Sequence, residues 1–204
     1  SSGGPHLHFE VRDTESEEVL DPIEYFKEKI TDTRAPKIQG ILVCPQSGKG
    51  VVNGSSRKLE LKPVTAKNGK QTITGKIEAW GEIGLAVKAY DYMDNTTNIY
   101  GVKDITLRQD SQIIYHSNLN RFAFDETRYL NSYVDYEEWK ERRSFYMRSF
   151  VEPGNRLRFN ESINRGIIHI EEEKTYHLTY TLADAFGNTT RLSVWIEGKE
   201  QEIP

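Results

Sequence analysis

Residues 84–91 read Gly-Leu-Ala-Val-Lys-Ala-Tyr-Asp, and residues 176–184 read Tyr-His-Leu-Thr-Tyr-Thr-Leu-Ala-Asp. Each stretch is rich in the apolar, β-branched and aromatic residues that strands prefer, and each predicts a strand. Each also runs into a turn that begins at an aspartate, with Asp94-Asn95 after the first and Gly187-Asn188 after the second. In an antiparallel sandwich, such an echo indicates two strands that leave one sheet at the same end.

Most of the chain beyond residue 36 has the same β character. Turn pairs such as Asn53-Gly54 and Asn68-Gly69 separate the apolar stretches. Several short strands at this spacing predict a mostly β protein built as an antiparallel sandwich. The predicted strands cover residues 37–44, 57–61, 72–79, 84–90, 103–109, 112–115, 166–170, 176–182 and 191–197.

Three places in this region are similar to immunoglobulin-like modules of bacterial surface proteins. They are Ala35-Pro36-Lys37-Ile38, Ala89-Tyr90-Asp91, and Asp184-x-x-Gly187-Asn188 followed by the apolar stretch 192–196. The resemblance implies an immunoglobulin-like antiparallel β-sandwich over residues 34–204, enlarged by a β-hairpin insert near 46–80 and a helical insert near 120–160. Two smaller sandwiches split near residue 118 are the alternative.

A short helix is predicted over residues 21–30. Asp21 is a good N-cap, Pro22 suits the first helical position, and Glu24, three residues after the cap, reads as a capping box. Residues 31–36 then break the helical pattern, because the proline at their end disfavours helix before it. We place a domain boundary there, between residues 1–33 and residues 34–204.

A second helix is predicted to begin at Asp135, with Glu138 completing the capping box. The spacing of Trp139, Tyr146 and Phe150 favours one shared face on a helix that ends before residue 153. The three tryptophans and the Tyr-rich stretch at Tyr129, Tyr133 and Tyr136 are expected mainly in the core, and an exposed face of rings that stacks on sugars is the alternative.

Composition excludes several classes of function. The formal net charge of -4 provides no basic surface for a nucleic acid backbone. No apolar run approaches the ~20 residues that a membrane-spanning helix needs. Cys44 is the single cysteine, so the chain has no intrachain disulfide and no cysteine-based metal site.

The first residues carry the sharpest chemical signal. Pro5-His6-Leu7-His8-Phe9-Glu10-Val11-Arg12 alternates strictly between apolar and polar residues, which predicts a strand. His6 and His8 would project from the same face, with their Cβ atoms roughly 6–7 Å apart, twice the rise per residue. Such a pair can serve zinc chemistry, one imidazole as a ligand and its neighbour beside the bound water.

Gly-Gly-Pro-His-Leu-His-Phe-Glu-Val-Arg at residues 3–12 resembles the closing motif of the lysostaphin-like zinc metallopeptidases, which cut peptide cross-links in peptidoglycan. The resemblance covers about the first thirty residues, and Asp21-Pro22 looks like the usual exit from that domain. It implies that His8 is a zinc ligand and His6 a catalytic residue. The rest of residues 1–33 would then be the C-terminal strand and short helix of the peptidase domain.

The other site residues of that family have no counterpart here. They are an upstream His-x-x-x-Asp motif and a further catalytic histidine, and the three remaining histidines, at 116, 169 and 177, follow no ligand spacing. One histidine does not hold zinc tightly, because zinc sites use three or four protein ligands. The chain alone is therefore expected to bind no zinc and to be catalytically incomplete.

These implications define the predicted function. The chain is expected to be the C-terminal region of a bacterial cell-envelope zinc metalloendopeptidase of the peptidoglycan-hydrolysing type, exported to the periplasm or envelope. In the parent protein the substrate would be a peptidoglycan cross-link peptide, and this region would act as an accessory module with an envelope protein as a possible partner. A non-catalytic cell-surface binding or scaffolding module for a protein or glycan ligand is the alternative.

A second group of residues could hold a cation. Asp91, Asp94 and Asn95 lie in one predicted turn and Asp184 begins another, and clustered carboxylate and amide oxygens are what calcium selects. Aspartate and asparagine also cap turns through hydrogen bonds to their own backbone. The turn-capping interpretation is favoured, because the oxygens lack the spacing of a known calcium motif.

Overall fold

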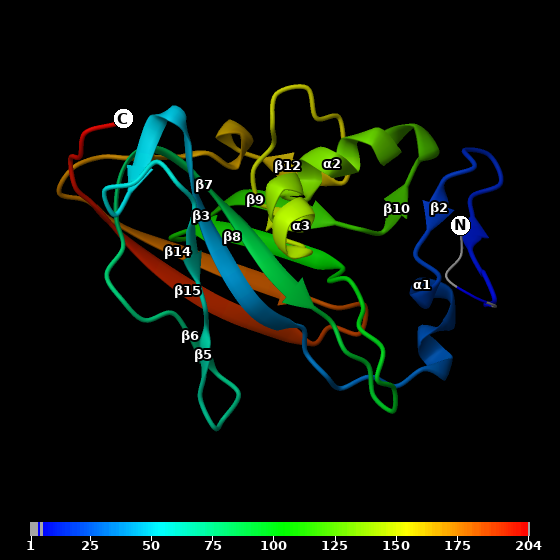
Figure 1. The fold of residues 1–204 in the computed structure, drawn as a ribbon. Helices are drawn as coiled ribbons and strands as arrows, with labels where there is room; N and C mark the ends of the chain where they lie inside the picture. Colours follow the sequence, from blue (N-terminus) through cyan, green and yellow to red (C-terminus); the bar gives the residue numbers. More distant parts are fainter. Residues whose placement is uncertain (1–3, 5, 204) are drawn as a thin grey trace.

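The computed structural model describes residues 4 and 6–203 and shows a mostly β protein with one large, curled sheet (Figure 1). The strands are β1 (Val11–Arg12), β2 (Val19–Leu20), β3 (Lys37–Val52), β4 (Leu59–Leu61), β5 (Val64–Thr65), β6 (Gln71–Thr72), β7 (Glu78–Tyr90), β8 (Asp104–Gln109), β9 (Gln112–Asn118), β10 (Arg121–Phe122), β11 (Met147–Arg148), β12 (Asn160–Ser162), β13 (Ile168–Ile170), β14 (Thr175–Ala183) and β15 (Thr189–Gly198). The helical segments are α1 (Ile23–Phe26), α2 (Leu130–Tyr133), α3 (Tyr136–Arg142) and the 3₁₀ turns η1 (Lys27–Lys29), η2 (Phe124–Tyr129) and η3 (Asn164–Gly166).

The main sheet follows the order β12-β9-β8-β14-β15-β7-β3-β4, with β11 and β13 added to the edge of β7. Neighbouring strands are antiparallel except where β15 meets β7 in parallel. Because β8 pairs with β14, strands from both sides of residue 118 share this sheet. The short strands β1, β2 and β10 form a separate sheet, and β5 and β6 form a hairpin.

The core lies against one face of the curled sheet. Along β14 the side chains alternate between buried and more accessible, as the period of two in a strand requires. Leu178, Tyr180 and Leu182 of β14 are buried with Leu192 and Val194 of β15. Most of the predicted strands are thus confirmed in position, and several extend further than predicted. The strand predicted over residues 72–79 is wrong, because only its two ends, in β6 and β7, are in strands.

A second apolar cluster covers the other face of β3 and β7. Tyr146 and Phe150 pack there against Cys44, and two glycines give them room. A Cβ on Gly40 would lie 2.3 Å from the Tyr146 hydroxyl, and one on Gly84 would lie 2.5 Å from the Phe150 ring. Burial raises the pKa of the Cys44 thiol to about 12, so this cysteine acts as a small apolar residue.

The expected strand over residues 5–12 is largely wrong. Only Val11 and Arg12 are in a strand, paired with β2, and Pro5 lies outside the described residues. A strand needs a neighbour for its backbone groups, and the described residues place none beside positions 6–10. The first helix is also shorter than expected: Asp21 accepts a hydrogen bond from the Ile23 amide, but α1 gives way to the turn η1.

The second helix begins where it was predicted and ends early. The Asp135 side chain accepts the amide of Glu138, but its own backbone N–H bonds Tyr146 rather than completing the capping box. Arg143 adopts the left-handed conformation with φ 52°, which ends α3. Tyr146 and Phe150 therefore lie on an extended segment, and the expected shared helix face is wrong.

The expectation that the tryptophans and the Tyr-rich stretch lie mainly in the core is correct for Tyr133 and wrong for the tryptophans. Trp80 and Trp139 are half-buried, and Trp195 is exposed. Trp195 stacks on His177 of the neighbouring strand, with ring centroids 4.0 Å apart. Apolar aliphatic residues and tyrosines fill the core in their place.

Asp135 joins the helical insert to the main sheet. Its fully buried carboxylate accepts hydrogen bonds from Lys58 at 2.8 Å and from Arg148 at 3.3 Å. Burial acts to raise the pKa of Asp135, but the hydrogen bond from Lys58 and the charge of Arg148 outweigh it and hold the pKa below its usual value. The carboxylate thus caps α3 and neutralises two cations from different segments.

We predict that Asp135→Ala lowers the free energy of unfolding by about 3 kcal/mol, because it leaves two partly buried cations without their partner. Urea denaturation measures the change. Glu137→Ala is the matched control, since Glu137 also bonds Lys58 but is exposed, and it should cost no more than about 0.5 kcal/mol. Equal losses in the two variants would contradict this role for Asp135.

Candidate functional site

The two motif histidines lie at the exposed start of the described chain. Nδ1 of His6 is 2.9 Å from the Gly4 carbonyl, and Nε2 of His8 is 3.4 Å from a Glu10 oxygen. Glu10 is also held by Arg12, at 2.5 Å. Both histidines are on the surface, where their imidazoles are accessible to another domain or to solvent.

The residues present do not form a zinc site around His6 and His8. Among residues 4 and 6–203, neither histidine belongs to a group of three or more side chains that could hold a metal. The other histidines lie on strands of the main sheet: His116 bonds Asp104 at 2.7 Å, and His177 bonds Ser193 at 3.0 Å. Zinc needs three or four protein ligands, so any zinc at this motif requires further residues.

The segment that follows the motif is docked on the rest of the molecule. β2 pairs with β10, which precedes the helical insert, and the Asp21 amide bonds the Asn120 carbonyl at 2.9 Å. Glu18, which is buried, accepts hydrogen bonds from Arg121 at 2.5 Å and from Arg158. The hydrogen bond from Arg158 lowers the pKa of Glu18, so this carboxylate is charged at neutral pH.

A second ion cluster docks α1. Lys103, immediately before β8, bonds both Asp21, at 3.1 Å, and Glu24. Lys27 of the same segment also bonds Glu24, at 2.7 Å. Together with β2, these contacts join residues 18–27 to β10, to Arg158 and to the residue that precedes β8.

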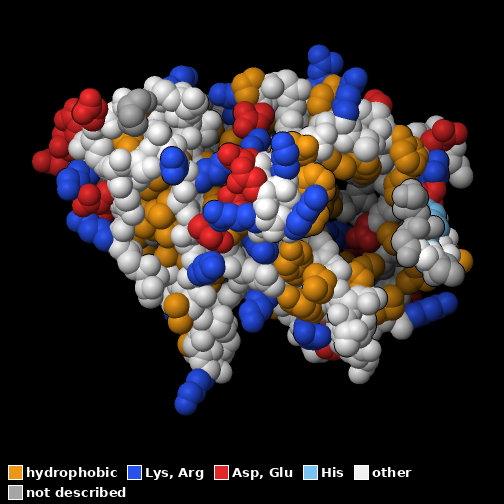
Figure 2. Space-filling model, viewed as in Figure 1, with side chains coloured by type: hydrophobic (Ala, Val, Ile, Leu, Met, Phe, Trp, Pro, Cys, Tyr) orange, Lys and Arg blue, Asp and Glu red, His pale blue; other side chains and the backbone are white. Residues whose placement is uncertain are grey.

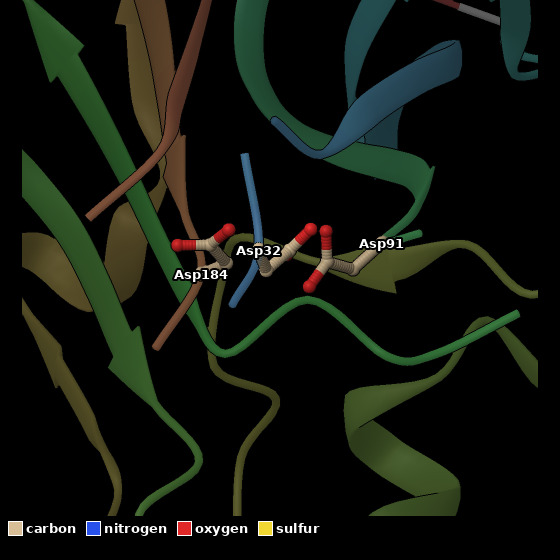
Figure 3. Close-up of side chains that lie close together, drawn as sticks. All are labelled: Asp32, Asp91 and Asp184. Carbon is tan, nitrogen blue, oxygen red and sulfur yellow. The ribbon is translucent and has the colours of Figure 1, made fainter. Parts of the chain in front are cut away.

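Three aspartates converge at one end of the main sheet. Asp91 follows β7, Asp184 follows β14, and Asp32 lies in the linker that precedes β3. All three are buried, and each offers one carboxylate oxygen within 4.8 Å of the others. Figure 3 shows the Asp32 carboxylate between those of Asp184 and Asp91. The predicted echo between the two strand ends is confirmed, because β7 and β14 do deliver their aspartates to one place.

Hydrogen bonds satisfy part of this cluster, which we call the triaspartate centre (Asp32, Asp91 and Asp184). One Asp184 oxygen accepts the amides of Phe186 and Asn188, as a turn cap does. One oxygen of Asp91 accepts the Tyr92 amide at 2.9 Å. The turn-capping interpretation is therefore correct for these bonds, but it leaves other carboxylate oxygens unexplained.

Asp32 carries the clearest unexplained atom. Its Oδ1 accepts the amides of Arg34 and Asp94, whereas its Oδ2 is buried without a hydrogen-bond partner. Among the described residues, no lysine, arginine or histidine forms an ion pair with any of the three carboxylates. The nearby Arg34 guanidinium donates instead to the Met93 carbonyl.

Burial and the neighbouring carboxylates both affect the pKa of Asp91. Burial and the charges of Asp184 and Asp32 raise its pKa to about 6, against a hydrogen bond from the Tyr92 amide and the charge of Arg34. An aspartate is normally ionised well below that pH. Concentrated negative charge of this kind attracts a cation or a proton.

The other two residues of the calcium hypothesis lie beside the centre rather than in it. Asp94 accepts hydrogen bonds from the amide and hydroxyl of Thr33, at 3.0 and 2.9 Å, and so holds the linker. Asn95 is exposed in the turn with φ 58°. The sequence analysis did not identify Asp32, which lies in the stretch assigned as a domain boundary. The only available signal was the presence of an acidic side chain in that stretch.

An apolar groove of about 500 Å³ opens between the helical insert and the end of β7. Hydrophobic side chains gather around the hollow on the face shown in Figure 2. Tyr100, Phe122 and Phe145 are among the residues that line it. Polar groups are few, so the groove does not resemble a site that orients a sugar through hydrogen bonds.

Comparisons with protein-family models, with curated proteins and with solved structures find no match for this chain. No helix among the described residues has the length and apolar character that crossing a membrane requires. The assignment of function therefore depends on the motif and on the geometry of the two sites.

We predict that, with a chelator present, the protein loses stability as the pH rises through about 6. The pKa of Asp91 is higher in the folded state than its value of 3.8 without burial, so the folded state binds more protons between the two values and rising pH favours unfolding. Thermal unfolding followed from about pH 4 to about pH 7 measures this. Asp91→Asn should flatten the dependence, whereas Asp125→Asn, an exposed control, should leave it unchanged.

Proposed function

We propose that this chain is the C-terminal region of a bacterial cell-envelope zinc metalloendopeptidase that cleaves peptidoglycan cross-link peptides. Residues 34–204 would be an accessory module with an enlarged immunoglobulin-like sandwich. The docking of the motif-bearing segment on this module is the observation that carries the proposal. An accessory module can influence a catalytic domain only if the two are held in a defined relation.

Two kinds of contact support such a relation. Strand β2, which pairs with β1 at the end of the motif, also pairs with β10 of the module. The ion clusters around Glu18 and Lys103 then join the same segment to β8 and to the helical insert. Ordinary flexible linkers lack such pairing, so this segment is suited to transmit a fixed orientation.

The motif itself presents surface that a peptidase domain would cover. Leu7 is 92% exposed and Phe9 is 61% exposed, although both are large apolar side chains. In the proposed parent protein, neighbouring strands would pack on this apolar face. His8 would then be one of the zinc ligands and His6 would lie beside them, with the other ligands supplied from outside these 204 residues.

The experiment compares this chain with a version extended upstream by a full domain. We expect zinc binding and hydrolysis of peptidoglycan only in the extended version. In that version, His8→Ala should abolish tight zinc binding, and His6→Ala should abolish hydrolysis while zinc is retained. His169→Ala, an exposed histidine on β13, is the matched control and should change neither.

Stoichiometric zinc in the short chain would contradict the proposal, because its motif residues would then be completed by ligands within residues 1–204. An extended version without zinc or hydrolysis would instead favour the non-catalytic binding or scaffolding module. Its apolar groove would then be the first surface to test against envelope proteins.

We predict that Lys103→Met loosens the docked segment without unfolding the module. Loss of charged hydrogen bonds to Asp21 and Glu24 should raise hydrogen exchange at the Asp21 amide by about tenfold. Lys27→Met is the matched control, since Lys27 bonds the same glutamate from within the segment and should not affect docking. Similar exchange rates in the two variants would show that Lys103 does not hold the segment.

A further inference from the structure

We propose that the triaspartate centre is a calcium site, in which Asp32, Asp91 and Asp184 bind one Ca²⁺ and so join the linker to the ends of two strands of the main sheet. This proposal is independent of the zinc peptidase function. It concerns a different metal, different ligands and a different end of the N-terminal segment.

The convergence of three carboxylates is the first observation. Each residue offers an oxygen within 4.8 Å of the other two, from three segments that are far apart in sequence. Buried charges are normally paired or bound to a metal, because removing a carboxylate from water is costly. In the described part of the chain, these three have no ion-pair partner.

The second observation is the Oδ2 atom of Asp32. Asp32 is 7% exposed, and its Oδ2 is buried without any hydrogen-bond partner. An unpaired buried acceptor is destabilising, and native structures rarely retain one without a purpose. The carboxylate that carries this atom lies between the other two (Figure 3). The central position of the Asp32 carboxylate and its unpaired oxygen both suit a cation bound among the three aspartates.

The ligand chemistry favours calcium over smaller ions. Ca²⁺ takes roughly 6–8 oxygen ligands in flexible geometry, whereas Mg²⁺ keeps several of its waters and is usually bound by only one or two carboxylates. Three converging carboxylates therefore suit calcium better. Zinc would additionally prefer nitrogen or sulfur ligands, and none is among these side chains.

The linker is already prepared for this role by hydrogen bonds. Asn188 donates to the Asp32 carbonyl at 3.1 Å and to the Asp184 carboxylate at 2.8 Å. Asp94 holds the following residue, Thr33, by two hydrogen bonds. Binding Ca²⁺ would add a bond through the Asp32 side chain itself, so that the linker is held more firmly in the same step that neutralises the carboxylates.

The test titrates the full 204-residue chain, purified with a chelator and then freed of it, with Ca²⁺ alone by isothermal calorimetry. We expect one ion per chain with a Kd of about 10⁻⁵–10⁻³ M. A Ca²⁺ concentration about a hundredfold above Kd should raise the unfolding temperature by roughly 5–10 °C. Mg²⁺ should bind at least about tenfold more weakly.

Asp32→Asn keeps the shape of the side chain and the acceptor for the two backbone amides, and it should weaken Ca²⁺ binding at least about tenfold. Asp125→Asn, at an exposed aspartate, should bind as the natural chain does. Trypsin adds a local readout, because Ca²⁺ should slow cleavage after Arg34 in the natural chain and not in Asp32→Asn.

Three results would overturn the proposal. The first is a folded natural chain that shows no heat and no thermal shift with millimolar Ca²⁺. The second is binding that is unchanged in Asp32→Asn. If that variant fails to fold, Asp184→Asn replaces it, and the calorimetry of the natural chain remains decisive. The third is equal binding of Mg²⁺, which would refute the assignment to calcium.

Discussion

Backbone pairing along both edges of β7 is the constraint on which the rest of the structure depends. β3 follows one edge from Lys37 opposite Tyr90 to Val52 opposite Ala79. The other edge is paired in turn by β11, β13 and the end of β15. Because buried backbone groups must be hydrogen-bonded, a long central strand of this kind draws segments from across the chain to itself.

That pairing also explains why the three aspartates meet. β3 begins opposite the last residue of β7, so the linker before β3 has to end beside Asp91. β15 lies between β14 and β7 in the sheet, and the hydroxyl of Thr190 on β15 bonds the Pro36 carbonyl of the same linker. The turn that carries Asp184 is therefore brought to the linker as well. The like charges are concentrated by sheet topology, and the protein has to neutralise them by protonation or by a cation.

The sequence predicts the parts of this arrangement that depend on local composition. The apolar, β-branched and aromatic content of 84–90 and 176–182 predicts β7 and β14, because strands favour these residue types. The alternation in residues 5–12 misleads, because a strand also needs a neighbour and periodicity does not reveal one. The early end of α3 is equally hidden, since it depends on the left-handed Arg143 and on the packing of Tyr146 over Gly40.

The sequence likewise predicts some residues of the candidate sites and not others. His6 and His8 are recognisable because their spacing and their flanking residues are local. Asp91 and Asp184 are recognisable as a pair because each ends a similar strand. Asp32 is not, since nothing within the linker indicates that its carboxylate will face the other two. Convergence of residues separated by about 60 and 150 positions is a property of the sheet and not of any motif.

The ion clusters and the triaspartate centre lie at opposite ends of one segment. The ion clusters at Glu18 and Lys103 hold its first half, and the triaspartate centre holds the linker at its end. The contacts of Glu18 and Lys103 already orient the segment that carries the histidine motif, so calcium would act on the linker that follows it. With calcium bound, α1 and η1 would lie between two anchored ends, and motion of the linker relative to the main sheet would be restricted.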